Sequence, residues 1–380
     1  MTDQQIPGFE ILEKLGQGGM AAVYRARQIS LDRIVAIKVL SSHLSHDPAD
    51  IERFRLEAQQ AAKLKHPGIV QVYDAHIGGE FSYFVMEYVA GYTVGDWLRR
   101  KGVLPEKDVL LVAECVADAL DYAWQTAGMI HCDIKPDNII VDADGTVKVA
   151  DLGLARTINA MSVSRESDEV MGTPAYMSPE QAMGLPDLDC RADIYSLGAM
   201  LYHLSTGRLM FEGEPEDKVM ELQVNGTVPD PIDLNPNLSR PFCWMLEKML
   251  AKKRELRYAD WTAVRADLLR VKKGMPLLQP LPEGSSTVSR STKRLKAVVQ
   301  KPPAAEANGG VERSGLSLAT KVAVCAGIVV VLIWGIKEML QPEVSHPTLP
   351  PPPKTAPPAP VPTSGAQPAA RQTPAVAPDQ

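Results

Sequence analysis

Cysteine is scarce in this 380-residue sequence, which contains only five, and they form no regular pattern. The five are far apart, odd in number and include no Cys-x-x-Cys pair. Such spacing argues against a disulfide framework and against a structural zinc site, and it fits a reducing compartment. A signal peptide is not expected either, because residues 1–7 are polar and a strand-like run already begins at Phe9.

The sequence also lacks an apolar run that length alone would identify as a membrane helix. Residues 322–336 carry no charge, but at ~1.5 Å per residue these 15 residues span ~22 Å, against a hydrocarbon core of ~30 Å. A helix of residues 316–340 is long enough to cross the hydrocarbon core if the side chains of Lys321 and Lys337 extend toward the headgroups and Trp334 lies near an interface. The alternative is a buried helix of a globular domain, but no domain surrounds it. We therefore predict one transmembrane helix over residues 316–340.

Charge and proline divide the chain into zones. The formal net charge of −6 averages an acidic N-terminal part with residues 272–321, which hold nine Lys or Arg and three Asp or Glu. The charge therefore gives no reason to expect nucleic acid as a partner. Residues 272–315 lack periodicity and are predicted to be a disordered basic linker. Residues 341–380 hold 13 of the 31 prolines and are predicted to be a disordered Pro/Ala-rich tail.

Basic residues are concentrated on the N-terminal side of the predicted membrane helix. By the positive-inside rule, this places the N-terminal globular part in the cytoplasm and the tail outside it. We therefore expect a single-pass protein of the cell membrane.

The most informative stretch is HCDIKPDN at residues 131–138. It runs into a predicted β-hairpin with strands at residues 139–141 and 146–149 and turn residues between them. Folding this hairpin brings Asn138 and Asp151 side by side. Their side-chain oxygens suit Mg²⁺, which also binds nucleotide phosphates. The stretch therefore predicts a metal clamp on ATP.

Two other polar residues in this stretch have the chemistry of phosphoryl transfer. Asp133 is placed to accept the proton of an attacking hydroxyl, and Lys135 to neutralise charge on the transferring phosphoryl group. Considered without the rest of the chain, these eight residues could also be an ordinary buried polar loop beside a hairpin.

The N-terminal region begins with two predicted strands, residues 9–15 and 22–27, joined by a glycine-rich loop. Gly16, Gly18 and Gly19 let backbone amides approach phosphates closely. A plain turn is the alternative for such a loop in isolation.

A predicted strand and helix follow the glycine-rich loop. Lys38 ends an apolar strand, where an ammonium needs a carboxylate or a phosphate as a partner. In the predicted helix Glu57 falls on the same face as Phe54 and Ala58, so we expect it to pair with Lys38. The alternative is that Glu57 lies on a solvated face and pairs with Arg53.

Taken in order, these motifs resemble the catalytic core of eukaryotic-type Ser/Thr protein kinases, and most closely their bacterial transmembrane branch. DLG at residues 151–153 follows the HxDxKxxN stretch, and GTPAYMSPE at residues 172–180 is highly specific to protein kinases. The resemblance covers residues 9–271. It implies an α+β, bilobal protein kinase fold with a small β-rich N-terminal lobe (about residues 9–86) and a larger helical C-terminal lobe (about residues 91–271).

The resemblance also implies the reaction and the nucleotide site. The chain would transfer the γ-phosphate of ATP to Ser or Thr hydroxyls of proteins, with Asp133 as the base and Lys38 orienting the phosphates. Met86 would be the gatekeeper, and the backbones of Glu87 and Val89 would bind adenine. The apolar slot for the base would be formed by Leu15, Val23, Ala36 and Ile140.

Two charged residues acquire structural roles from the same resemblance. Asp193 would brace the catalytic loop from a buried helix, and Arg257 would pair with Glu180. Considered alone, each is an ordinary surface charge.

Three positions depart from the kinase pattern. Ala21 stands where a third glycine is expected, and Leu152 replaces phenylalanine. Cys132 replaces the arginine that in many kinases meets a phosphate on the activation segment. No catalytic group is lost. We hypothesise that activity depends less than usual on phosphorylation of Ser162, Ser164 or Ser167.

We expect protein substrates with Ser or Thr acceptors, and autophosphorylation within residues 157–173 and 285–292. The sequence does not decide between a monomer and a homodimer. One alternative function is a non-catalytic membrane scaffold with a kinase fold, against which the retained Lys38 and Asp133 argue. Another is a small-molecule phosphotransferase, against which residues 172–180 argue.

Overall fold

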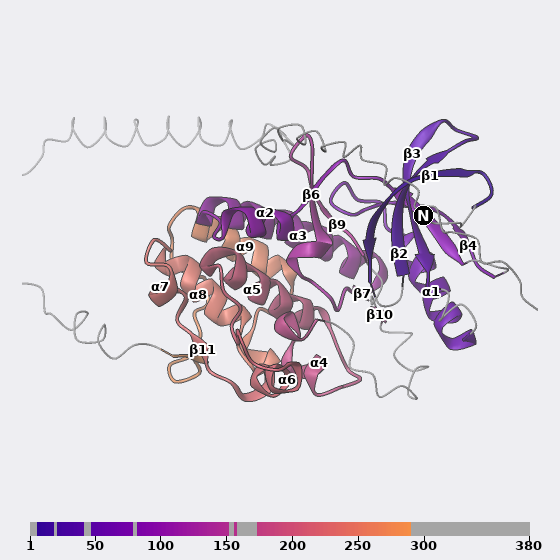
Figure 1. Ribbon diagram of the computed structural model, residues 1–380. Helices are drawn as coiled ribbons and strands as arrows, with labels where there is room; N and C mark the ends of the chain where they lie inside the picture. The colour runs from indigo at the N-terminus through magenta and orange to yellow at the C-terminus, as the bar shows by residue number, and fades with distance from the viewer. Residues whose placement is uncertain are drawn as a thin grey trace, which may run out of the picture.

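The computed structural model describes residues 6–18, 21–41, 47–78, 82–151, 156–157 and 173–289, which form two lobes (Figure 1). The N-terminal lobe is built on an antiparallel five-stranded sheet with strand order β1-β2-β3-β5-β4. This confirms the predicted bilobal fold with a β-rich first lobe. The strands are β1 (Phe9–Gln17), β2 (Ala21–Gln28), β3 (Arg33–Leu40), β4 (Val72–His76) and β5 (Tyr83–Glu87).

The register of the sheet decides which side chains face the second lobe. Val23 pairs with Lys38 across β2 and β3, and Ala36 pairs with Met86 across β3 and β5. Because side chains alternate along a strand, these four share one face of the sheet. The opposite face carries its own apolar cluster, which includes Tyr24, Ala26, Val35, Ile37 and Val85.

Helix α1 (Pro48–Ala61) packs on the face of the sheet that carries Lys38. It begins cleanly because the Asp47 carboxylate accepts a hydrogen bond from Ala49 N at 2.8 Å. Phe54 is buried, and its ring lies 5.1 Å from that of Phe84 on β5. This contact fixes the helix against the sheet.

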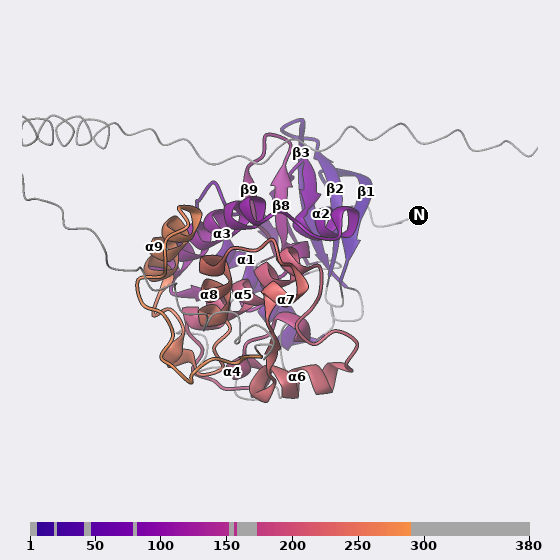
Figure 2. The same ribbon diagram turned by 90° about the vertical axis from the view of Figure 1, so that its left-hand side faces the viewer.

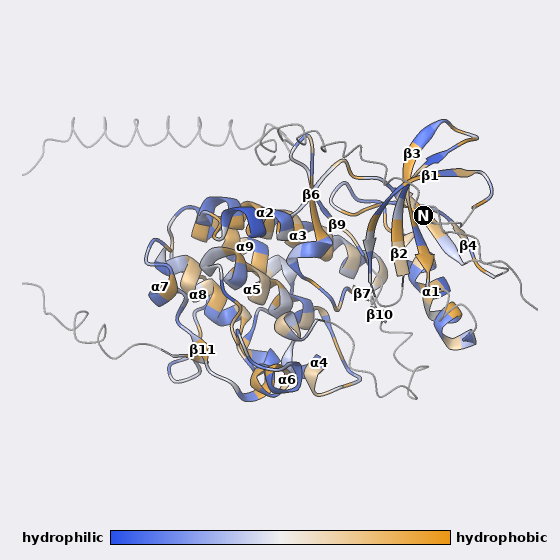
Figure 3. Ribbon diagram, in the orientation of Figure 1, coloured by the Kyte–Doolittle hydropathy of each residue, from blue (hydrophilic) through white to orange (hydrophobic). Residues whose placement is uncertain are grey.

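The C-terminal lobe is helical and centred on α5 (Cys190–Thr206), of which nearly every residue is buried. Figure 2 views the molecule from the side of this lobe, with the N-terminal sheet behind it. In Figure 3 the strands are rich in hydrophobic residues, and polar residues gather at the turns. The other helices are α2 (Val94–Lys101), α3 (Glu106–Ala127), α4 (Pro179–Ala182), α6 (Glu216–Asn225), α7 (Pro231–Leu234), α8 (Arg240–Met249) and α9 (Trp261–Lys272).

The predicted hairpin is present as β8 (Ile139–Asp142) and β9 (Val147–Val149), and β6 (Gly91–Thr93) pairs with β8. These strands lie between the two lobes (Figure 1). Val149 N donates to Gly68 O at 2.8 Å, and Val149 O accepts from Val70 N at 2.9 Å. The hairpin is therefore bonded directly to the loop that follows α1.

The C-terminal lobe extends beyond its predicted boundary at residue 271. Residues 272–289 belong to it and are not part of a disordered linker. Leu277 is buried, Lys248 Nζ donates to Gln279 O at 2.7 Å, and β12 (Val288–Ser289) pairs in parallel with β11 (Val228–Pro229). The prediction failed because composition does not reveal these long-range contacts.

In the part of the chain described by the structure, no helix combines the length and the apolar character needed to cross a bilayer. The predicted membrane helix at residues 316–340, the tail at 341–380 and residues 290–315 of the linker lie outside that part. So does most of the predicted autophosphorylation segment, including residues 158–172. The remaining short strands are β7 (Met129–Ile130) and β10 (Arg156–Thr157).

Candidate active site

Lys38 joins two carboxylates that lie far apart in the sequence. Its Nζ atom donates to Glu57 Oε1 at 2.7 Å and also binds the carboxylate of Asp151. Lys38 and Glu57 are each only 9% exposed, so the predicted pair is present and the solvated alternative for Glu57 is wrong. Burial alone would lower the pKa of Lys38, but the two carboxylates raise it above the ordinary value and keep the ammonium charged.

The two carboxylates differ in environment. Burial raises the pKa of Glu57, and the Lys38 charge opposes that rise. Desolvation acts in the same direction on Asp151, but Lys38 lowers its pKa below the ordinary value. The Asp151 side chain is 47% exposed, so it remains accessible while it touches Lys38. Asp151 is therefore the carboxylate better suited to meet a metal–nucleotide complex.

Asp133 receives hydrogen bonds on both carboxylate oxygens. Its Oδ1 accepts from Thr173 N at 3.0 Å and from Thr173 Oγ1 at 2.8 Å. Its Oδ2 lies 2.7 Å from Lys135 Nζ, which also donates to Thr173 Oγ1 at 3.0 Å. One aspartate and one lysine thus hold the same threonine hydroxyl. Sequence reasoning did not single out Thr173, although it lies within the GTPAYMSPE string.

Asp193 on α5 holds the loop that carries Asp133. The backbone amides of His131 and Cys132 donate to the Asp193 carboxylate at 2.7 and 2.9 Å. Asp193 is 1% exposed, and burial raises its pKa. The predicted bracing contact is therefore present, and it fixes the backbone immediately before the Asp133 carboxylate.

His131 completes this anchor. Asp133 N donates to His131 Nδ1 at 3.3 Å, so Nδ1 is the acceptor and Nε2 carries the proton toward Ala150 O at 3.1 Å. Ala150 immediately precedes Asp151. The histidine therefore links the catalytic loop to the end of the hairpin.

Cys132 adopts a backbone conformation that is unusual for its residue type. Its φ angle is +68°, in the left-handed region. Its carbonyl accepts from Gln181 Nε2 at 2.7 Å, while its amide donates to Asp193. The backbone is therefore held from two sides, as expected where strain is maintained at a functional site. Sequence reasoning missed Gln181 because no local pattern predicts its contact.

The hairpin presents the two expected metal ligands at its open end. Asn138 Nδ2 donates to Asp133 O at 2.8 Å and to Asp133 Oδ2 at 3.2 Å, which turns the amide oxygen of Asn138 away from that carboxylate. Ala150 N donates to Asn138 O at 2.8 Å, so Asn138 lies beside the residue before Asp151. These hard oxygen donors fit a divalent cation.

Protein side chains alone do not complete such a metal site. Among the described residues, no group of three or more His, Cys, Asp or Glu is arranged to hold a metal. A cation held by Asn138 and Asp151 would therefore take its further ligands from phosphate oxygens and water, as Mg²⁺ usually does.

Three of the side chains predicted for the adenine slot lie on the sheet face that carries Lys38. Val23, Ala36 and Met86 share the sheet face of Lys38, as shown above, and Ile140 lies on β8. Ala36 is buried and Leu15 is 46% exposed, whereas Val23, Met86, Val89 and Ile140 are half-buried. In the glycine loop, Gly16 is exposed and Gly18 N donates to Ala21 O at 2.9 Å, while Gly19 lies outside the described residues.

The segment predicted to bind adenine is tied to its surroundings by a lysine that sequence reasoning did not identify. Lys148 Nζ on β9 lies 3.0 Å from Glu87 Oε1 and donates to Pro67 O at 2.9 Å. Glu87 N donates to Gln71 O at 2.8 Å. The hairpin thereby holds the Glu87 side chain, and the loop after α1 holds its backbone.

A buried ion pair closes the C-terminal side of the site. Arg257 Nη1 and Nη2 donate to Glu180 Oε1 and Oε2 at 2.6 and 2.8 Å. The side chains are 0% and 5% exposed, so the predicted pair is present and is not a surface contact. It anchors α4 and the end of the GTPAYMSPE string.

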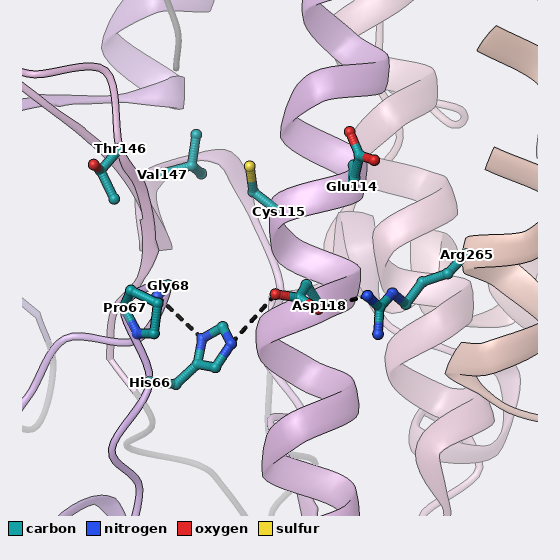
Figure 4. Close-up of a pocket in the computed structure, with 9 residues that line it drawn as sticks. All are labelled: His66, Pro67, Gly68, Glu114, Cys115, Asp118, Thr146, Val147 and Arg265. Atoms are coloured by element: carbon teal, nitrogen blue, oxygen red, sulfur yellow. Dashed lines mark hydrogen bonds and ion pairs between the residues drawn. The ribbon is translucent and has the colours of Figure 1, made fainter. Parts of the chain in front are cut away.

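A separate cavity of about 160 Å³ lies where the loop after α1 meets α3 and α9 (Figure 4). His66 Nδ1 accepts from Gly68 N at 3.0 Å, and its Nε2 lies 3.3 Å from Asp118 Oδ2. Asp118 Oδ1 lies 2.8 Å from Arg265 Nη2. None of the predicted site residues lines this cavity. We interpret it as part of the joint between the lobes.

Comparison with known proteins agrees with this geometry. The sequence model of the protein kinase domain matches residues 9–268. Serine/threonine-protein kinase PknB is 40% identical over 272 residues in Mycobacterium leprae and 42% identical over 274 residues in Mycobacterium tuberculosis. Each alignment covers 70% of this chain and 43% of the relative. Serine/threonine-protein kinase PrkC of Bacillus subtilis is 37% identical over 260 residues, which cover 68% of this chain and 40% of PrkC.

The match thus spans about two fifths of the length of these curated relatives. A crystal structure of the Mycobacterium tuberculosis PknI kinase domain is similar as well, with a TM-score of 0.56 and 27% identity. That similarity covers 71% of this chain and 98% of the PknI domain. Kinases of this kind use ATP and a divalent metal in general. By its sequence and by its fold, this chain belongs to the protein kinase domain family.

Proposed function

We propose that this chain is a Ser/Thr protein kinase that transfers the γ-phosphate of ATP to hydroxyl groups of proteins. The observation that carries the proposal is the hydroxyl of Thr173, which hydrogen-bonds to Asp133 Oδ1 at 2.8 Å and accepts from Lys135 Nζ at 3.0 Å. Asp133 and Lys135 can thus hold a threonine hydroxyl between them, as they would hold the acceptor hydroxyl of a peptide in place of Thr173. Relatives named as Ser/Thr-protein kinases at 37–42% identity support this assignment.

In the proposed reaction the acceptor oxygen forms a bond to the γ-phosphorus, and the bond from that phosphorus to the β,γ-bridging oxygen breaks. Asp133 takes the acceptor proton, and Lys135 offsets negative charge at the transferring group. Lys38, held by Glu57, orients the phosphates of ATP. Charge neutralisation on the phosphates is the contribution of Mg²⁺, for which Asn138 and Asp151 are the proposed ligands.

The nucleotide would lie against the sheet face that carries Lys38. We propose that the backbones of Glu87 and Val89 bind adenine, that Met86 lies behind it and that Gly16 and Gly18 approach the phosphates. The support is the sheet register, which puts Met86 opposite Ala36 on the face that carries Lys38. The remaining contacts with the base would come from Leu15, Val23, Ala36 and Ile140.

We further propose that residues 316–340 anchor the kinase to the cell membrane, with the catalytic domain in the cytoplasm and the tail on the other side. The support is the apolar run flanked by basic residues. Autophosphorylation within residues 157–173 and 285–292 is part of the same proposal, because both segments contain Ser or Thr hydroxyls.

The decisive experiment measures transfer of radiolabelled phosphate from ATP to casein by the full chain. Asp133→Asn keeps the size of the side chain but removes the base, and a rate about 10²- to 10⁴-fold below wild type is expected. Asp144→Asn is the matched control, because Asp144 is an exposed turn residue of the β8–β9 hairpin that follows the Asp133 loop, and its rate should equal wild type. Equal background labelling by wild type and Asp133→Asn would favour the non-catalytic scaffold.

A further inference from the structure

The backbone next to Thr173 is held by a buried glutamine on a distant helix. Gln223 on α6 is 0% exposed, and its Nε2 donates to Pro174 O at 2.9 Å and to Ala175 O at 3.0 Å. Both protons of one amide group are thus used on two successive carbonyls. Few side chains other than an amide could satisfy both carbonyls at this position.

The orientation of this amide is set by two further residues. Tyr195 on α5 donates its hydroxyl proton to Gln223 Oε1 at 2.6 Å. Lys252 Nζ donates to the oxygen of Tyr195 at 2.9 Å. A lysine ammonium can only donate, so Tyr195 must accept from it and pass its own proton to Gln223. The charged Lys252 therefore sets the direction of each hydrogen bond in the series from Lys252 through Tyr195 and Gln223 to the two carbonyls.

Lys252 is an unusual choice for a purely structural position. Its ammonium lies 5.4 and 5.2 Å from the ring centroids of Tyr195 and Phe211 and donates to Leu222 O at 3.3 Å. Among the described residues no carboxylate forms an ion pair with it, and Glu180, the carboxylate that acts on neighbouring Tyr195, is bonded to Arg257. Burial, together with the positive charge of Arg257, lowers the pKa of Lys252 to about 7. A charge in this setting is costly, which favours a role beyond packing.

The carbonyls at the end of this chain border the proposed reaction site. Thr173 touches Asp133 through both its amide and its hydroxyl. A peptide whose hydroxyl reaches Asp133 must therefore run beside the backbone of residues 173–176. A small shift of that backbone would misplace the peptide. Lys38 and the sheet face proposed to bind adenine belong to the N-terminal lobe instead.

We propose that Gln223, Tyr195 and Lys252 are positioning residues that fix the backbone of Pro174 and Ala175 against the bound protein substrate and so set its affinity. This inference rests on the proposed kinase function and deepens it. The three residues do not touch ATP, so their effect belongs to the KM for the protein substrate and not to the KM for ATP.

The test uses the full chain, casein and ATP, with steady-state kinetics. Gln223→Glu is isosteric but turns a carboxylate toward the two carbonyls, and we expect the KM for casein to rise about tenfold or more, which corresponds to about 1.4 kcal/mol. The KM for ATP should stay within about twofold of wild type. Tyr195→Phe, which removes only the hydroxyl and keeps the ring, should shift the KM for casein in the same direction by a smaller factor.

The pH profile separates positioning from packing. Above pH 7 neutral Lys252 can accept a hydrogen bond from the Tyr195 hydroxyl, which then no longer donates to Gln223, so the wild-type KM for casein should rise between about pH 6 and pH 8. Lys252→Met should have a raised KM that is flat with pH. The exposed neighbour Lys253 provides the control Lys253→Met, which should behave as wild type.

Two results would overturn the inference: variants that melt at lower temperature but keep the wild-type KM for casein, or a KM for ATP that rises in parallel with that for casein. Failure of the kinase proposal would look different, because wild type itself would not label casein. The mild Tyr195→Phe change keeps the test decisive if Gln223→Glu does not fold.

Discussion

At the scale of single residues, the ammonium of Lys38 is shared between a buried carboxylate and an exposed one. Glu57 holds it from within the N-terminal lobe, and Asp151 meets it from the end of the hairpin. Because Asp151 is also a proposed metal ligand, the permanent partner of Lys38 must be Glu57. This division of roles can be tested by removing one charge at a time.

Replacing Glu57 by glutamine keeps the shape of the side chain but removes its charge. We expect kcat/KM for ATP to fall about ten- to a hundredfold, since an unheld lysine no longer places the phosphates accurately. Glu52→Gln, on the exposed side of the same helix, is the control and should leave kinetics unchanged. Kinetics of Glu57→Gln that match Glu52→Gln would show that the ion pair is dispensable.

The contact between Lys38 and Asp151 should also be visible in acid. Desolvation would raise the pKa of Asp151, but Lys38 lowers it below its ordinary value of 3.8. The Asp151 carboxylate is therefore harder to protonate in the folded state than in the unfolded state. The contribution of its contact with Lys38 to the free energy of unfolding is complete above pH 3.8 and is lost as the pH falls through the folded pKa. In melting experiments between about pH 5 and pH 2.5, Asp151→Asn should lose Tm less steeply than wild type. Parallel curves for the two proteins would contradict the predicted linkage.

Residue-level predictions from sequence succeeded where chemistry restricts the choice. A lysine that ends an apolar strand must find a carboxylate, and Glu57 was the acidic residue on the apolar face of the next helix. The contacts of Gln181 with Cys132 and of Lys148 with Glu87 were missed. They join residues that are 49 and 61 positions apart, and no local spacing predicts which partner a neutral amide or a lysine on a strand will choose.

At the scale of elements, the buried pair of Glu180 and Arg257 fastens α4 to the turn that precedes α9. Arg257→Met leaves Glu180 charged and without this partner in the interior, and we expect a loss of about 3–5 kcal/mol in the free energy of unfolding. Urea denaturation measures it. Arg254 lies three positions before Arg257 and forms an ion pair with the largely exposed Asp187. Arg254→Met should therefore lower the free energy of unfolding by less than about 1 kcal/mol. Similar losses for both variants would show that burial does not matter.

Elements with local signals were predicted well. The hairpin of β8 and β9 follows from turn residues between two apolar runs, and α1 from the spacing of Phe54, Glu57 and Ala58. The order of the five strands in the sheet could not be derived from such patterns, because strand pairing depends on contacts between distant segments. The family resemblance predicted only a small β-rich lobe, and the order of its strands is known from the structure.

At the scale of the whole molecule, the folded unit includes residues 272–289, beyond its predicted end at residue 271. Leu278 N donates to Asp267 Oδ1 at 2.8 Å, and Thr287 Oγ1 donates to Leu250 O at 3.3 Å, so the segment is bonded along its length. A chain that ends at residue 271 should be less stable than one that ends at 289, because it exposes the pocket of Leu277. We expect a lower Tm and a lower soluble yield for the shorter chain. Identical melting curves would show that residues 272–289 add nothing.

The bonds between Val149 and the loop after α1 have a mechanical consequence. Residue 149 is two positions from the proposed metal ligand Asp151, and the loop at residues 68–70 continues from the helix that carries Glu57. Glu57 on α1 and Asp151 after β9, the two carboxylates that bind Lys38, therefore lie on segments that cannot move independently. A binding partner that tilts α1 would therefore move Asp151 as well. The alignment of the phosphates by Lys38 and the binding of the metal would then change together.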